Sequence, residues 1–124
     1  MRLPPNLASQ QARQFVDELA YRLEELGDIE IKRFFGGYAL RYAGVQFAMV
    51  MQGRLYFHVD ESTRAKYQEQ QSQAFHYVSK TKDIIVQRYF EVPAGPLESD
   101  AELIIWARES IRTVKIKGTS CSNP

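Results

Sequence analysis

The stretch that decides the fold is FFGGYALRYAGVQFAMVMQGRLYFHV, residues 34–59. After Gly36-Gly37, apolar and polar residues alternate with the period of two that is typical of half-buried strands. Two glycine-bearing turns, at Ala43-Gly44 and Gln52-Gly53, divide the stretch into three short strands. The stretch therefore predicts an antiparallel β-meander.

The register of these strands follows from keeping one face apolar, because a slip of one residue turns every side chain to the other face. A two-residue turn at Ala43-Gly44 pairs Tyr42 with Val45. For the second turn we predict a three-residue loop, 51–53, with Gly53 left-handed in a bulge. The inner face is then predicted to carry Tyr38, Leu40, Tyr42, Val45, Phe47, Met49, Leu55, Phe57 and Val59. The outer face is predicted to carry Ala39, Arg41, Gln46, Ala48, Val50, Arg54, Tyr56 and His58.

An amphipathic helix is predicted before the meander. Apolar residues recur at spacings of three and four over 10–26, with charges between them. Ser9 or Asn6 can cap its start, and Gly27 can end it. Residues 1–8 are expected to be an N-terminal extension.

Further elements are predicted after the meander. Asp60 is expected to cap a short helix whose early acidic residues suit the helix dipole. Two strands, at 75–78 and 84–92, follow around a turn. Ser99 and Glu102 then fit the capping box of a last helix.

The resulting fold class is α+β, with the order α-β3-α-β2-α in two layers. The antiparallel sheet, a meander plus a hairpin, is expected to be covered by helices mainly on one face. One domain is predicted over residues 9–115, followed by a flexible tail over 116–124.

Composition excludes several classes of protein. The 44% hydrophobic and 25% charged residues are typical of a globular domain. The formal net charge of +1 disfavours independent binding to DNA, which usually needs a clear basic excess. Cys121 is the only cysteine, so an intramolecular disulfide is impossible. Neither a secretory signal nor a membrane span is visible, so we expect a cytoplasmic protein without membrane contact.

Few residues indicate catalysis or metal binding. His58 and His76 lie eighteen positions apart without a nearby second pair of ligands, and both are expected to be exposed strand residues. No serine lies in a nucleophile elbow, and the carboxylate pairs lie at helix ends. We therefore expect no catalytic residue, no metal and no cofactor.

The Gly36-Gly37 pair allows two interpretations. As a ligand loop it would lead into a helix N-terminus, but here it leads into a strand. The favoured interpretation is steric: the glycines allow positive φ and close backbone approach, with Phe34 and Phe35 filling the core behind them. A small-ligand or enzymatic module using this loop remains the alternative.

A protein-contact surface is predicted on the outer face of the meander. Tyrosine and arginine are frequent anchors of interfaces, which singles out Arg41, Val50, Arg54 and Tyr56. A homodimer through the same face remains open. Direct DNA binding is a further alternative, through basic residues near the end of the last helix: Arg108, Arg112, Lys115 and Lys117.

Four separated motifs resemble the TfoX (Sxy) N-terminal domain family. They are Arg33-Phe34-Phe35-Gly36-Gly37-Tyr38-Ala39-Leu40, Val45-Gln46-Phe47-Ala48-Met49-Val50, Gly53-Arg54-Leu55-Tyr56-Phe57 and Tyr89-Phe90-Glu91-Val92-Pro93. The fold-determining positions among them and in the intervening turn are Phe34, Phe35, Gly36, Gly37, Gly44 and Gly53.

The resemblance implies a fold and a function. It implies the α-β3-α-β2-α order and a regulator of natural competence and DNA uptake. Such regulators are thought to act with a cyclic-AMP receptor protein at competence promoters, so nucleic acid contact would be indirect. The family offers no established catalytic residue. Known members also carry a helical C-terminal domain, and either an excised domain or a stand-alone member is expected here.

Overall fold

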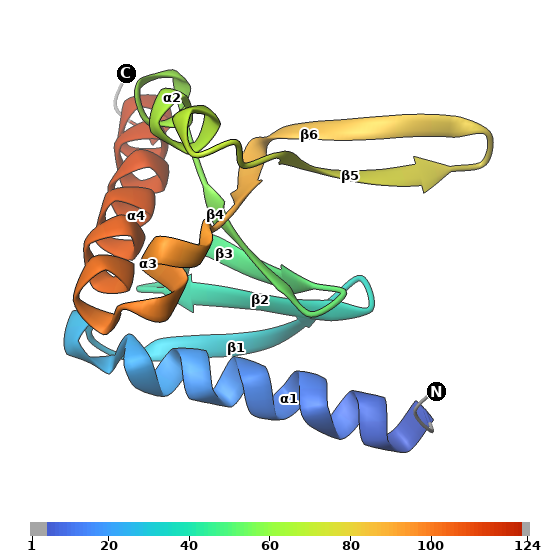
Figure 1. The fold of residues 1–124 in the computed structure, drawn as a ribbon. Helices are drawn as coiled ribbons and strands as arrows, with labels where there is room; N and C mark the ends of the chain where they lie inside the picture. The colour runs from blue at the N-terminus through green and yellow to red at the C-terminus, as the bar shows by residue number, and fades with distance from the viewer. Residues whose placement is uncertain (1–4, 123–124) are drawn as a thin grey trace.

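The structure is a computed structural model that describes the backbone of residues 5–122 and the side chains of residues 10–114. Figure 1 shows how the helices and strands are arranged along the chain. The helices are α1 (Pro5–Arg22), the 3-10 turn η1 (Glu24–Leu26), α2 (Glu61–Glu69), α3 (Ala94–Glu98) and α4 (Asp100–Ser122). The strands are β1 (Ile29–Phe34), β2 (Gly37–Tyr42), β3 (Val45–Met51), β4 (Arg54–His58), β5 (Ala74–Ser79) and β6 (Lys82–Glu91).

All six strands form one antiparallel sheet in the order β1-β2-β3-β4-β6-β5. The predicted α+β class with an antiparallel sheet is confirmed, but the meander has four strands rather than three. The additional strand, β1, pairs along β2 from Ile29↔Tyr42 to Phe34↔Gly37. A short helix, α3, also lies between β6 and α4, where no helix was predicted.

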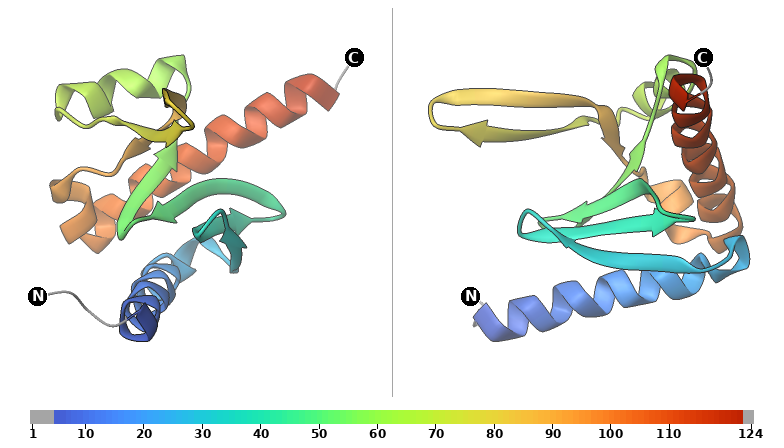
Figure 2. Two further views of the ribbon diagram at one scale, coloured as in Figure 1. Left: turned by 90° about the vertical axis from the view of Figure 1, so that its right-hand side faces the viewer. Right: turned by 180° about the vertical axis from the view of Figure 1, so that it is seen from behind.

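Helices pack against one face of the sheet and enclose a single core. In Figures 1 and 2, α1 runs beside β1 and β2, while α4 crosses β3 and β4. The hairpin β5–β6 projects away from this body (Figure 1). Fully buried side chains come from α1, β2, β3, β4, α2 and α4, and the largest are Tyr67, Phe47, Phe57, Leu19, Leu23, Leu40, Leu55 and Leu103.

The predicted register is correct at the first turn and wrong at the second. Tyr42 pairs with Val45, as expected. The second turn contains two residues rather than three, because Met51 pairs with Arg54. The face switch comes instead from a bulge within β3: Leu40 pairs with Ala48 and Arg41 pairs with Gln46, which leaves the intervening Phe47 as the extra residue. The face predicted for three residues is therefore wrong: Ala48 and Val50 belong to the core, and Met49 does not.

Phe35 and Gly36 form a two-residue hairpin turn between β1 and β2. Phe35 has a φ of 47° and Gly36 a φ of 81°, the positive values that a two-residue hairpin turn requires. The Phe35 ring is 85% exposed, so its predicted core position is wrong; it rests edge-on against Phe34 at 4.7 Å between ring centroids. Gly37 has a different role, because an added Cβ would lie 2.2 Å from the Val50 carbonyl oxygen. Positive φ at Gly36 and close backbone approach at Gly37 are thus both present, as the steric interpretation predicts.

The helix ends depart from the expected positions. The helix α1 begins at Pro5, within the predicted extension, so Ser9 and Asn6 are not its caps. At the other end, α4 continues to Ser122, within the predicted tail. Asp60 does cap α2 as predicted, and its carboxylate accepts from the backbone N–H groups of Ser62 and Thr63.

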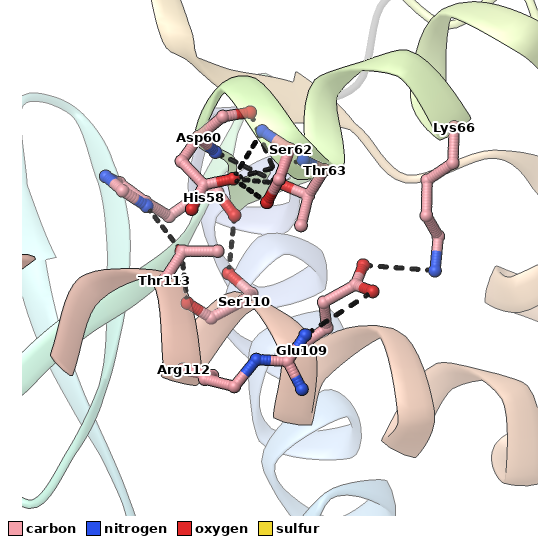
Figure 3. Close-up of polar contacts among 9 residues, drawn as sticks. All are labelled: His58, Asp60, Ser62, Thr63, Lys66, Glu109, Ser110, Arg112 and Thr113. Atoms are coloured by element: carbon pink, nitrogen blue, oxygen red, sulfur yellow. Dashed lines mark hydrogen bonds and ion pairs between the residues drawn. The ribbon is translucent and has the colours of Figure 1, made fainter. Parts of the chain in front are cut away.

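Ser110 of α4 occupies the point where β3 and β4 separate. The pairing of these strands ends at Ala48↔Phe57. Beyond it, the Ser110 hydroxyl lies 2.8 Å from the Phe47 carbonyl oxygen and 2.9 Å from the His58 carbonyl oxygen, and donates toward both. Figure 3 shows this contact from α4 to β4. The helix thus provides the hydrogen bonding that the strands no longer provide to each other.

We expect Ser110→Ala to lower the free energy of unfolding by about 1–3 kcal/mol, because two buried carbonyl groups lose their donor. Urea unfolding followed by circular dichroism measures the change. Arg108→Ala, an exposed change on the same helix, should stay within about 0.5 kcal/mol of wild type. Equal losses in both variants would contradict the structural role of the hydroxyl.

Gly37→Ala should lower the free energy of unfolding by about 1–3 kcal/mol, since the new methyl group meets backbone rather than a movable side chain. The matched control is Gly95→Ala, where the added Cβ has open space and no positive φ is required. That control should be neutral or slightly stabilising. Thermal unfolding of both variants tests the difference, which an unchanged Gly37→Ala midpoint would refute.

Asp60→Ala should cost about 1 kcal/mol near neutral pH through loss of the α2 cap. Burial raises the pKa of the Asp60 carboxyl, but hydrogen bonds from Ser62 and Thr63 outweigh it and leave the pKa lowered. The stabilisation is therefore present above the unfolded-state pKa and is lost as pH falls through the folded-state pKa. The difference between the unfolding curves of wild type and variant should begin to shrink as pH falls below about 4; a gap that stays constant there would count against this assignment.

Candidate protein-interaction surface

The outer face of the meander is the face that turns away from the helices. Strand register places Lys32, Ala39, Met49, Tyr56 and Glu91 in one row across it, from β1 to β6. Ala39 and Met49, at the middle of the row, are nearly inaccessible to solvent. Tyr56 is half-buried, so the row becomes more accessible toward β4.

An aromatic strip continues this row onto the projecting hairpin. The Tyr56 ring meets the Phe75 ring edge-on at 5.2 Å, and Phe75 stacks against Tyr77 at 5.9 Å between centroids. The end of the strip, Tyr77, is 46% exposed. We refer to Tyr56, Phe75 and Tyr77 as the aromatic strip. It joins β4 to β5, which are not neighbours in the sheet.

Charged groups flank the strip at its β4 end. The Arg54 Nη1 atom lies 3.2 Å from Oε1 of Glu91, and the Arg54 side chain is 62% exposed. Burial raises the pKa of the Tyr56 hydroxyl, as does the nearby Glu91 carboxylate, while Arg54 acts in the opposite direction. Tyr56 therefore remains a neutral hydrogen-bonding group at physiological pH.

The structure brings together two of the four residues predicted for partner binding. Arg54 and Tyr56 share the outer face beside Glu91. Arg41 lies on the same face but farther along, where its Nη2 donates to the Gly44 carbonyl oxygen at 2.5 Å.

Val50 does not belong to this surface. Because of the bulge in β3, Val50 pairs with Tyr38 and Leu55 on the inner face and is 2% exposed. Its predicted outer position is wrong. Phe75 and Tyr77, which the prediction omitted, take part instead; only the folded hairpin shows that they reach Tyr56.

His58 is buried rather than exposed as predicted. Its ring lies edge-on to Tyr89 at 5.4 Å, and Nδ1 is 2.9 Å from the Thr113 hydroxyl. Thr113 already donates to the Ser110 carbonyl oxygen, so His58 Nδ1 is the donor in this contact. His58 therefore anchors β4 to α4. His76, in contrast, is exposed on β5 as expected.

Other parts of the described chain show no comparable site. The Gly36-Gly37 turn joins two strands, so no helix N-terminus points at it. A shallow depression near the end of α1 is lined by acidic groups, and its Arg22 side chain is engaged by Asp100 and the Leu97 carbonyl. Among the side chains of residues 10–114, no three His, Cys, Asp or Glu residues gather as metal ligands.

The basic C-terminal helix is only partly described. Arg108 is exposed, and Arg112 is 62% exposed with its guanidinium 3.9 Å from Glu109. Glu109 also pairs with Lys66 at 3.0 Å (Figure 3). The Glu109 carboxylate thus lies among the basic side chains and offsets part of their positive charge. The side chains of Lys115 and Lys117 fall outside the described residues.

Sequence comparison identifies the family to which the chain belongs. A search of curated protein sequences found no match. Over the part of the chain that the structure describes, no helix is both long and apolar enough to cross a membrane. The family model of the TfoX N-terminal domain matches residues 21–114, which cover the sheet, α2, α3 and most of α4. The chain therefore belongs to the TfoX N-terminal domain family.

Proposed function

We propose that this domain is a non-catalytic regulatory module that acts in transcription through protein contacts. The observation that carries the proposal is the aromatic strip, Tyr56, Phe75 and Tyr77, flanked by the exposed Arg54 guanidinium. Tyrosine and arginine are enriched among the residues that anchor protein interfaces. A catalytic role would need convergent polar groups, whereas this surface offers mainly aromatic contact area.

The partner we propose is a transcription activator of the cyclic-AMP receptor protein type, in the cytoplasm. Support comes from membership of the TfoX N-terminal domain family, because the resemblance to this family implies a regulator of natural competence and DNA uptake. Contact with DNA would be indirect, since the net charge is only +1 and Glu109 lies among the basic groups of α4. Regulation would then depend on how the aromatic strip meets the activator.

Tyr77→Glu and Arg54→Glu are expected to weaken binding to a purified cyclic-AMP receptor protein by about tenfold to thirtyfold each. The first places a charge in the aromatic contact, and the second reverses the charge beside it. Biolayer interferometry, with cyclic AMP and promoter DNA present, measures the affinity. Neither side chain belongs to the core, since Tyr77 is 46% and the Arg54 side chain 62% exposed, so the fold should persist.

Tyr21→Glu provides the matched control. Tyr21 is an exposed aromatic residue too, at 70%, but it lies on α1 outside the aromatic strip. The Tyr21→Glu variant should bind the cyclic-AMP receptor protein with the affinity of wild type. If all three variants bind alike, the aromatic strip is not the contact surface; if wild type itself does not bind, the proposed partner is wrong.

A further inference from the structure

The strand β5 forms one open edge of the sheet. It pairs with β6 on one side, and no other strand follows it in the sheet order. Every second residue of an edge strand turns its backbone N–H and C=O groups away from the sheet. Such groups can pair with another extended chain.

The turn of the hairpin determines which groups face outward. Ser79 pairs with Lys82 across the two-residue turn, so this pair is hydrogen-bonded. Hydrogen-bonded pairs alternate along an antiparallel ladder. Tyr77 therefore bonds to β6, as Phe75 does, while the backbone groups of His76 and Val78 turn outward.

This edge lacks the features that normally prevent strand addition. Natural edge strands are protected by charged residues, proline or bulges. The opposite edge strand, β1, carries Glu30, Lys32 and Arg33. The sequence of β5 is Ala-Phe-His-Tyr-Val-Ser, without Asp, Glu, Lys, Arg or Pro, and its one register shift lies at the base, between Ala74 and Phe75.

Apolar side chains border the edge on both faces of the hairpin. Phe75 and Tyr77 lie on one face, in line with Tyr56. On the other face Val78 is 67% exposed and Ile85 is 59% exposed. An added strand would therefore find apolar neighbours for its own alternating side chains on either face.

Positive charge at the hairpin tip makes the two ends of the β5 edge different, so it can orient an added strand. Lys80 and Lys82 are exposed there, and neither forms an ion pair with any described residue. Asp83 offsets only one of the two positive charges. Acidic residues at the adjacent end of an added strand would complement the tip.

We infer that β5 accepts an extended segment of a partner protein as an added strand of the sheet. Backbone hydrogen bonds to His76 and Val78 would hold the segment, and side chains would select it. The segment would carry apolar residues at alternate positions and Asp or Glu at the end beside Lys80 and Lys82. This inference rests on the proposed role in protein contact. The backbone groups of His76 and Val78 do not belong to the aromatic strip, although Phe75 and Tyr77 of the strip also border the edge.

The test uses a phage-displayed library of random twelve-residue peptides, selected on the wild-type domain. Enriched peptides should show alternating apolar residues with acidic residues at one end. One such synthetic peptide should shift the amide NMR signals of Ala74–Ser79. Its affinity for His76→Pro should fall about tenfold, because proline removes an outward N–H without breaking the ladder to β6.

His76→Ala is the matched control, since it removes the imidazole but keeps the N–H group. It should bind the peptide as wild type does, and both variants should keep the wild-type thermal midpoint. A second variant, Lys80→Glu with Lys82→Glu, should weaken binding of acidic peptides while leaving the residues of β5 unchanged.

Three results would overturn the inference: no enriched peptide, peptides that bind His76→Pro as tightly as wild type, or a doubled mass without peptide, which would make a second copy the occupant. The peptides are independent of the cyclic-AMP receptor protein. Failure here therefore leaves the proposed partner standing, and failure of that partner leaves the edge testable.

Discussion

One hydroxyl group, that of Ser110, holds the sheet at the point where it divides. The strand β4 pairs with β3 through Phe57 and with β6 from Tyr56 to His58, so the two ladders overlap only briefly. Where β3 leaves, the Phe47 and His58 carbonyl groups would lose their partners inside the core. Ser110 contacts both. The docking of α4, the divergence of β3 from β4 and the position of the β6 strand thus depend on one another.

The bulge in β3 belongs to the same arrangement. It turns Phe47 inward and directs the Phe47 carbonyl toward α4 rather than along an unbroken ladder. The same extra residue exchanges the two faces of the strand, burying Val50 and leaving Met49 outside the main core. Which residues remain for a partner is therefore a consequence of how the core is closed. The surface that results combines two meander residues, Arg54 and Tyr56, with aromatic residues of a distant hairpin.

Membership of the TfoX N-terminal domain family and the aromatic, arginine-flanked surface both support the proposed role in protein contact. The described polar groups serve mainly as caps and bridges between elements: Asp60 caps α2, and Ser110, Thr113 and His58 join α4 to the sheet. The accessible features that the proposals use are the aromatic strip and the edge strand β5. A domain built this way offers contact area and backbone hydrogen bonds, which suits recognition of other proteins.

The sequence by itself determined the class, the main elements and the family. Period-two alternation and the glycine turns are local signals, so the meander, the Tyr42–Val45 pairing and the Asp60 cap could be predicted. The strand β1 also alternates, Ile29-Glu30-Ile31-Lys32. It was not predicted because the charged residues, which suit an edge strand, leave it with few apolar positions. Arg54 and Tyr56 were predictable for the candidate surface; Phe75 and Tyr77 were not, because their contact with β4 spans distant segments. Only the tertiary structure decided the bulge, the burial of Val50 and His58 and the exposure of Phe35. Each of these depends on which elements pack against the strand, and the alternation of residues along a chain does not contain that information.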